Sequence, residues 1–298
     1  MNPLSLFCSI AIMLITGIVS YNAWISWQMS KSTGSIKKDS VTGIMKGAEP
    51  LLLNGNNGAA CLLIHGFIGS PTDFGRLPSL LHKAGFTVSV PLLPGHGTDP
   101  RDFAKTTPED LIQVVQSAHE RLKRNHSRVI LIGLSMGGAL SLIATQSLAI
   151  DQLILLAPYL KVKHFWYYLL PVEWHHQLLS PFIPYVYRLS CFKQVYKRDG
   201  ISQIVDYSYI PLSGVKTTFE IGRRASAVSN ITAPTLIIHS KKDKATDYNA
   251  SSQFIHKSKN PNFRFVTLEK SNHLILWDYE AEQVEKEILD FIQPGGQK

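Results

Sequence analysis

The chain has 298 residues, of which 45% are hydrophobic and 17% charged, and its formal net charge at pH 7 is +8. These proportions are typical of a packed globular protein and exclude an intrinsically disordered chain. The densest basic runs are short pairs such as Lys37-Lys38 and Arg223-Arg224, so we expect no nucleic-acid partner. The positive charge suits an anionic membrane surface better.

The first thirty residues contain no charged side chain. At 1.5 Å per helical residue, the apolar run from Pro3 to Trp27 is long enough to cross a hydrocarbon core of about 30 Å. Trp24 and Trp27 are expected at the lipid–water interface. We therefore expect a membrane anchor over residues 1–30, and residues 31–49, which are rich in Ser, Lys, Gly and Thr, to form a solvated linker.

The charges around the apolar run indicate the orientation of the anchor. Nothing basic precedes the run, whereas four lysines follow it: Lys31, Lys37, Lys38 and Lys46. This asymmetry favours a single-pass anchor with the rest of the chain in the cytoplasm. A cleaved signal peptide, which would leave a secreted or periplasmic protein, stays the alternative, although the basic segment that usually opens a signal peptide is missing.

From residue 50 onward, apolar runs typical of buried parallel strands alternate with helical patterns. The predicted strands are residues 59–65, 86–92, 128–134, 152–157, 235–240 and 263–268. Between them, Thr107 and Asp110 form a predicted capping box at the start of a helix, and the last helix should turn Val284, Ile288 and Phe291 or Ile292 inward. The alternation predicts a doubly wound, mostly parallel α/β sheet over residues 50–298.

Residues 159–231 interrupt this alternation with a long segment that is dense in aromatic residues and broken by Pro171, Pro181 and Pro184. A connection of that length inside a compact domain is usually functional. We expect a helical cap insertion over the carboxyl edge of the sheet, with some of its aromatic side chains lining a pocket for an apolar part of a substrate.

The sequence Gly-Leu-Ser-Met-Gly at residues 133–137 lies between a predicted strand and a helix-forming segment. In that context a strained turn exposes the serine hydroxyl at the edge of the sheet, and glycines are needed because strand and helix crowd each other there. We interpret Ser135 as a nucleophile. The alternative is an ordinary turn after a buried strand.

A serine nucleophile requires an imidazole base and a carboxylate that orients it. Asp243 follows one late strand and His273 follows the next, as this architecture requires. Asp247 is the rival acid, but it lies deeper in the loop and next to the following helix. The other histidines considered are more typical of packing, loop or surface positions: His96, His175, His176 and His239.

The tetrahedral intermediate of acyl transfer needs donors for its oxyanion. The amide of Met136 opens the helix after Ser135, and the amide of Phe67 lies in a glycine-containing turn after an early strand, so we expect these two amides to form the oxyanion hole. No HExxH or CxxC spacing occurs, and we expect no metal.

Five motifs together resemble the α/β-hydrolase superfamily and, more closely, its bacterial carboxylesterase and monoacylglycerol lipase branch. They are LLIHGFIGSPTDF, LLPGHGTDP, GLSMGG, SKKD and SNHLILWDYE, and the similarity covers residues 50–293. The resemblance implies a nucleophile at Ser135, an acid at Asp243, a base at His273 and oxyanion amides at Phe67 and Met136. It also implies hydrolysis of carboxylic esters of short or medium acyl chains without metal or organic cofactor.

The N-terminal apolar run and the long aromatic cap depart from that branch and favour a lipid-derived ester, such as a monoacylglycerol, as substrate. Two alternatives stay open. An amidase, peptidase or thioesterase would use the same groups, because acyl transfer does not depend on the leaving atom. A non-catalytic protein that binds a lipid or a partner would keep the fold alone.

Overall fold

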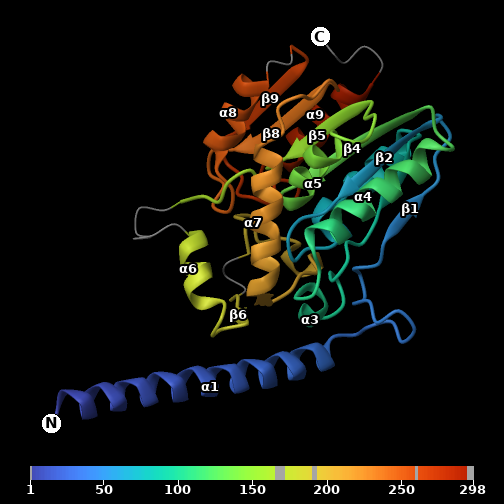
Figure 1. Ribbon diagram of the computed structural model, residues 1–298. Coiled ribbons are helices and arrows are strands. Elements are labelled where there is room, and N and C mark those ends of the chain that lie inside the picture. The colour runs from blue at the N-terminus through green and yellow to red at the C-terminus, as the bar shows by residue number, and fades with distance from the viewer. Residues whose placement is uncertain (1, 165–171, 190–192, 259–260, 294–298) are drawn as a thin grey trace.

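The computed structural model describes residues 2–164, 172–189, 193–258 and 261–293. Its centre is a seven-stranded sheet in the order β1-β3-β2-β4-β5-β8-β9 (Figure 1). The strands are β1 (Leu51–Leu53), β2 (Ala59–Ile64), β3 (Thr87–Val90), β4 (Arg128–Leu134), β5 (Gln152–Leu156), β8 (Thr235–Ser240) and β9 (Phe263–Leu268). β1 pairs antiparallel with β3 and the other pairs are parallel, which confirms the predicted α/β-hydrolase architecture.

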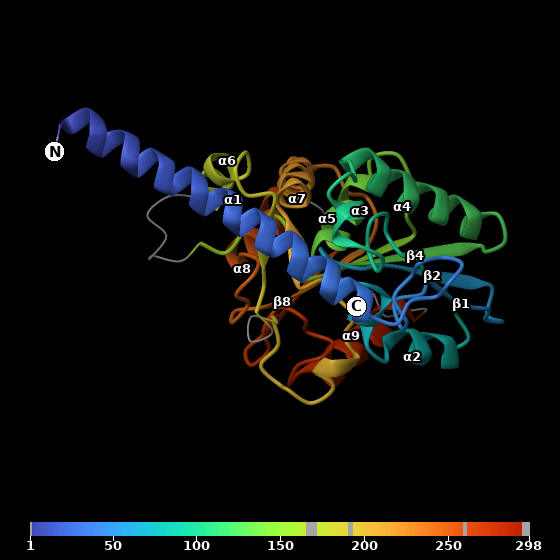
Figure 2. The same ribbon diagram turned by 90° about the horizontal axis from the view of Figure 1, so that it is seen from below.

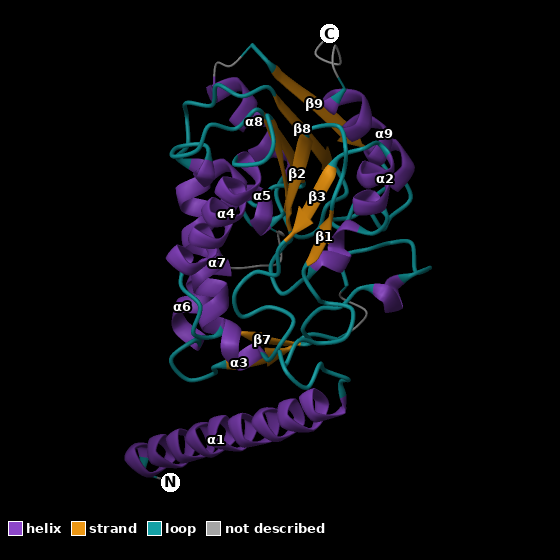
Figure 3. Cartoon of the chain, turned by 90° about the vertical axis from the view of Figure 1, so that its right-hand side faces the viewer, coloured by secondary structure: helices purple, strands orange, loops and turns teal. Residues whose placement is uncertain are grey.

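The four strands β2, β4, β5 and β8 are buried along nearly their whole length, as expected of apolar strands covered on both faces. Helices α2 (Leu77–Lys83) and α9 (Ala281–Ile292) cover one face of the sheet. Helices α4 (Pro108–Lys123), α5 (Met136–Ala144) and α8 (Tyr248–Ser258) cover the other face (Figure 3). The capping box of α4 and the inward face of α9 are confirmed.

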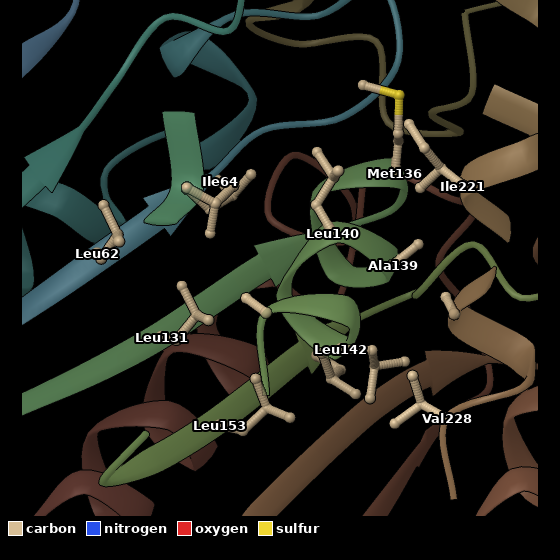
Figure 4. Packing of buried hydrophobic residues seen from close by; sticks show 14 of the residues in the cluster. Leu62, Ile64, Leu131, Met136, Ala139, Leu140, Leu142, Leu153, Ile221 and Val228 are labelled. Carbon is tan, nitrogen blue, oxygen red and sulfur yellow. The ribbon is translucent and has the colours of Figure 1, made fainter. Parts of the chain in front are cut away.

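The insertion predicted as a cap contains α6 (Val172–Leu179), a two-stranded antiparallel sheet of β6 (Tyr185–Tyr187) and β7 (Tyr209–Pro211), and α7 (Leu212–Ser226). Its fold is therefore mixed rather than purely helical. α7 packs against α5, and Ile221 of α7 belongs to the same core as Met136 and Leu140 (Figure 4). Residues 165–171 and 190–192 of the predicted cap, with several of its aromatic residues and Pro171, lie outside the described residues.

Helix α1 (Pro3–Ser35) is longer than the predicted anchor and lies along the outer side of the cap, away from the central sheet (Figures 1 and 2). By length and composition it is a candidate membrane span, with a mean hydropathy of 2.1 over its most apolar window, none of which is buried. A signal sequence passes the same test. The C-terminal half of α1 differs, because Ile25 and Met29 are buried against Tyr209 of the cap.

The segment predicted as a solvated linker is partly folded onto the domain. α1 continues to Ser35, and Met45 and Ala48 are buried in a small cluster with Phe103, the last residue of α3 (Pro100–Phe103), and Tyr207. The Met45 amide donates a hydrogen bond to the Gly97 carbonyl at 2.7 Å. Met45 and Ala48 are isolated apolar residues in a polar segment, so the sequence pattern does not indicate that they pack against the domain.

Candidate active site

Ser135 lies in a sharp turn between the end of β4 and the start of α5. Its backbone has φ 55° and ψ −118°, a conformation that L-residues rarely adopt. Hydrogen bonds from its amide to the Leu156 carbonyl at 2.9 Å, and to its carbonyl from the Tyr159 amide at 2.9 Å, hold the turn in place. The strained turn predicted for this serine is present.

The glycines around Ser135 are required by close backbone approaches. A Cβ on Gly137 would lie 1.9 Å from the Ile64 carbonyl oxygen, and one on Gly133 would lie 2.4 Å from the Gly137 carbonyl oxygen. α5 can therefore start directly against β2 and β4 only where side chains are missing. Gly66 on the facing loop is less restricted, because its Cβ would lie 3.2 Å from that of Ser135.

Three predicted site residues from distant parts of the chain meet at this turn. His273 Nε2 lies 2.8 Å from Ser135 Oγ, and His273 Nδ1 lies 2.7 Å from Asp243 Oδ2. Asp243 follows β8 and His273 follows β9, so the carboxyl ends of neighbouring strands bring them to the serine. All three residues are buried, at 7% exposure or less.

The Asp243 carboxylate accepts five hydrogen bonds. Oδ1 accepts the amides of Ala245 and Thr246 at 2.7 and 2.9 Å. Oδ2 accepts from Thr246 Oγ1, His239 Nε2 and His273 Nδ1 at 2.9, 3.1 and 2.7 Å. Burial raises the pKa of Asp243, but the nearby charge of His273 and the hydrogen bonds from His239 and His273 outweigh it and hold the pKa well below its usual range.

His239 and Thr246 are site residues that the sequence analysis missed. Because an ionised Asp243 only accepts hydrogen bonds, His239 Nε2 donates to it, and His239 Nδ1 accepts from Ser251 Oγ at 2.9 Å. The separation of four residues between His239 and Asp243 does not by itself indicate a contact, because His239 lies within a predicted strand and the contact depends on how the following turn folds back.

Two acidic residues of the last motif fix the loop that carries His273. Asp278 Oδ2 accepts the Asn272 amide at 2.7 Å and the Tyr196 amide at 2.9 Å. Glu280 accepts the amides of residues 269, 270 and 271 and the Ser271 hydroxyl at 2.8–3.0 Å. The ring of His273 is thereby held between Ser135 and Asp243.

The rival residues have other contacts. Asp247 Oδ1 accepts the Asn249 amide at 3.0 Å in the first turn of α8. His96 is buried against Phe103, with ring centroids 4.4 Å apart, and burial lowers its pKa to about 4. His176 Nε2 lies 2.5 Å from the Leu212 carbonyl oxygen. The side chain of His175 lies outside the described residues.

The loop after β2 faces Ser135 and includes Phe67. Hydrogen bonds hold the residues on either side of Phe67 in place. The Gly66 amide donates to Asp73 Oδ2 at 3.2 Å, and the Ile68 carbonyl accepts the Tyr207 amide at 3.1 Å. Ile68 has a φ of 54°, so the loop curls sharply. Within the described residues, the amides of Phe67 and Met136 donate no hydrogen bond to a protein acceptor, which leaves both available.

Asp73 stands beneath this loop. A Cβ on Gly69 would lie 2.0 Å from Asp73 Oδ2, so the carboxyl group packs directly against the loop backbone. The pKa of Asp73 is raised to about 7, mainly by burial; the hydrogen bond from Gly66 opposes this rise, and the nearby Asp206 adds to it. We therefore expect this carboxyl group, beside the candidate oxyanion site, to change its protonation state near neutral pH.

A cavity of about 270 Å³ opens in front of Ser135 and His273. Its apolar lining, here called the apolar wall, includes Phe67, Leu134, Tyr159, Val162, Ile210, Val215, Phe219 and Leu274. Its polar lining, here called the polar wall, includes Asp73, Arg188, Gln194 and Asp206. Arg188 Nη2 donates to Asp206 Oδ2 at 2.6 Å, and Lys193 Nζ lies 3.2 Å from Oδ1. The buried Nε of Arg188 has no hydrogen-bond partner among the residues that the structure describes.

The seven-stranded sheet, the strained turn at Ser135 and the cavity in front of it are those of one class of protein. The chain is a serine hydrolase of the α/β-hydrolase superfamily. A family profile described as serine aminopeptidase, S33, matches residues 55–280, and the chain belongs to that family. Although this description names a peptidase, two curated relatives are a monoacylglycerol lipase and a carboxylesterase. The chain is accordingly a serine carboxylic-ester hydrolase.

Two curated relatives and one solved structure illustrate the similarity. The chain is 39% identical to the thermostable monoacylglycerol lipase of Bacillus sp. strain H-257 over 99 residues, which span 33% of this chain but only 39% of the lipase. It is 23% identical to a carboxylesterase of Bacillus subtilis strain 168 over 253 residues, 82% of this chain and 96% of the esterase. A solved structure from work on the metagenome-derived lipolytic enzymes LipS and LipT superposes with a TM-score of 0.75 at 25% identity, covering 84% of this chain and 98% of the other.

Proposed function

We propose that this protein is a membrane-anchored serine hydrolase that cleaves carboxylic esters of lipid-derived or medium-chain acyl groups, such as monoacylglycerols. The observation that carries the proposal is the hydrogen-bonded line from Ser135 through His273 to Asp243 at the mouth of a mainly apolar cavity. A serine that only terminates a strand needs neither a strained φ nor an imidazole within 2.8 Å.

In the proposed mechanism, Ser135 Oγ attacks the ester carbonyl while His273 Nε2 takes its proton. Asp243 holds the Nδ1 proton of His273 and stabilises the imidazolium that forms. The amides of Phe67 and Met136 donate to the oxyanion of the tetrahedral intermediate. His273 then protonates the leaving alcohol, and water, activated by the same imidazole, releases the acid from the acyl-enzyme.

The two walls of the cavity suggest the form of the substrate. The apolar wall, with Phe219, Val215 and Ile210, suits an acyl chain. The polar wall, with Arg188 and Gln194, suits a hydroxylated or otherwise polar leaving alcohol. An ester with one apolar and one polar half, such as a monoacylglycerol or a lysolipid, fits both, and a monoacylglycerol lipase among the relatives supports this choice.

The proposed organisation assigns residues 1–30 to the anchor, residues 31–49 to the connection and residues 50–298 to the hydrolase domain, with the insertion over residues 159–231. The four lysines after the anchor support a cytoplasmic domain. Protease added to intact cells tests this orientation. A cytoplasmic domain stays intact until the cells are opened, whereas cleavage in intact cells would favour a domain outside the cytoplasm.

The proposed activity is tested on the full chain in detergent micelles with monolauroylglycerol and with matched lauroyl ester, thioester and anilide substrates. We expect the esters to be cleaved fastest. Preference for the anilide would favour a peptidase or amidase, and preference for the thioester a thioesterase. A fluorophosphonate probe that labels the wild type but not Ser135→Ala would exclude a protein that only binds lipid, and failure of labelling would support one.

A further inference from the structure

Helix α1 is joined to the cap through specific contacts along its C-terminal half. Tyr21 Oη donates to the Tyr185 carbonyl at 3.1 Å, and Asn22 Nδ2 donates to the Phe182 carbonyl at 2.8 Å. Ile25 and Met29 are fully covered by the same surface. The cap therefore has a fixed position relative to α1 and cannot rotate freely about it.

The N-terminal part of α1 leaves the domain on the side of α6 and extends past it (Figures 1 and 2). Pro3–Ser20 is free of charge and mainly exposed, and its eighteen residues measure about 27 Å as a helix, close to the thickness of a hydrocarbon core. Tyr21 and Asn22 follow directly, which puts the point where α1 meets the cap at the expected level of the membrane boundary.

At that point the cap presents apolar side chains to solvent. Leu178, Leu179 and Phe182 are 62%, 48% and 58% exposed, although each is large and apolar. The Phe182 carbonyl is the one bonded to Asn22, so this edge lies beside α1. We call these three side chains the α6 edge.

We infer that the α6 edge lies in the lipid–water interface of the bilayer that holds α1, so that the cap itself contacts lipid. This inference rests on the proposed membrane insertion of α1. A bilayer is favoured over a protein partner because the edge continues the uncharged surface of α1 at the depth where aromatic and amphipathic side chains collect, next to Tyr21 and Trp24.

The contact would bring lipid close to the cavity. On its inner side α6 carries His176, whose ring packs edge-on against Phe219 with centroids 5.5 Å apart, and Phe219 lines the cavity. One helix therefore separates the α6 edge from the apolar wall of the active-site cavity. An acyl chain leaving the bilayer beside α6 would have only this helix to pass before it reaches that wall.

The test uses the full chain in nanodiscs of palmitoyl-oleoyl phosphatidylcholine. Cys8→Ser and Cys191→Ser leave only the buried Cys61. Into this background Leu179→Cys is introduced and labelled with a polarity-sensitive NBD dye. The matched control is Leu52→Cys, an equally apolar and 61% exposed position on β1, across the domain from α6. Leu14→Cys in α1 reports whether the helix is inserted.

We expect the dyes at positions 14 and 179 to emit at shorter wavelength than the dye at position 52 and to be quenched by nitroxide-labelled lipid. Aqueous iodide should quench the dye at position 52 most strongly. If position 14 is in lipid while position 179 behaves like position 52, the inference is wrong although the anchor stands. If position 14 is also in water, both the proposed anchor and this inference are wrong. The proposed ester hydrolysis is not affected by that result, because the activity assay tests it independently.

Discussion

His239 and His273 contact the same oxygen of Asp243, Oδ2, at 3.1 and 2.7 Å. The carboxylate is therefore oriented from two sides, and we expect His239 to act as a positioning residue through Asp243. Replacing His239 by Phe removes one hydrogen bond to a buried charge, which typically contributes about 1.5–3 kcal/mol. We expect the unfolding free energy to fall by about 2 kcal/mol and kcat to fall more than KM rises.

His239→Gln, which keeps a donor, is the control for this prediction and should recover most of the stability and of kcat. Urea unfolding and steady-state ester hydrolysis measure the two effects. Equal losses in both variants would show that the size and packing of the imidazole matter here rather than its hydrogen bond.

Asp73 gives a prediction about pH. Its pKa in the folded protein is raised to about 7, so the folded state binds the proton more tightly than the unfolded state. The stability contributed by the protonated group is complete below the unfolded pKa of about 4 and is lost as the pH rises through about 7. The free energy of unfolding of Asp73→Asn, relative to that of the wild type, should therefore rise by up to about 4 kcal/mol between about pH 4 and pH 8.

The same variant should change the pH profile of hydrolysis. An ionised Asp73 lies beside the proposed oxyanion site and opposes the developing negative charge, so wild-type kcat should decline above about pH 7. Asp73→Asn should flatten this alkaline limb. An alkaline limb that is unchanged in Asp73→Asn would assign it to another group.

The glycines after Ser135 differ sharply in what they tolerate. A methyl group at Gly137 would lie 1.9 Å from the Ile64 carbonyl oxygen, whereas one at Gly138 would lie 3.0 Å from Pro158 Cβ. Gly137→Ala should therefore lower the unfolding free energy by about 3 kcal/mol or more, and Gly138→Ala by clearly less. Thermal unfolding of both variants checks the difference, and similar losses would mean that the turn relaxes more easily than the structure indicates.

The contact between α1 and the cap predicts different roles for the two halves of the helix. Ile25 is fully buried, and Ile25→Ala should lower the free energy of unfolding of the cap by about 2–4 kcal/mol, seen as faster proteolysis within residues 172–189 in detergent. Ile15→Ala, at a 61% exposed position of the same helix, is the matched control and should leave the wild-type rate unchanged. Equal rates in both variants would mean that α1 is only an anchor.

The main features of the candidate site could be predicted from sequence because its parts follow strands with strong apolar patterns. Ser135 and Asp243 each come within a few residues after a buried strand, His273 follows the half-buried strand β9, and parallel strands end at one edge of the sheet. The roles of His239 and Thr246 could not be predicted, because both depend on how the turn after β8 folds back over Asp243.

The contact between α1 and the cap could not be predicted either, for a different reason. An uncharged helix has the same sequence pattern whether a given side faces lipid or protein, so Ile25 and Met29 were indistinguishable from the exposed residues before them. The β6–β7 sheet was missed because three-residue strands carry too little pattern. Residues 31–49 were expected in solvent because their polar composition concealed Met45 and Ala48.

The central claim is that Ser135 is a nucleophile activated by His273 and Asp243. The most direct measurement is the hydrolysis of p-nitrophenyl esters from acetate to palmitate by the full chain, with Ser135→Ala, Asp243→Ala and Asp247→Ala measured in parallel. We expect medium-chain esters to be cleaved, Ser135→Ala to lose about 10⁴-fold or more of kcat, Asp243→Ala nearly as much, and Asp247→Ala little. Wild-type rates in Ser135→Ala, or a larger loss in Asp247→Ala than in Asp243→Ala, would contradict the account.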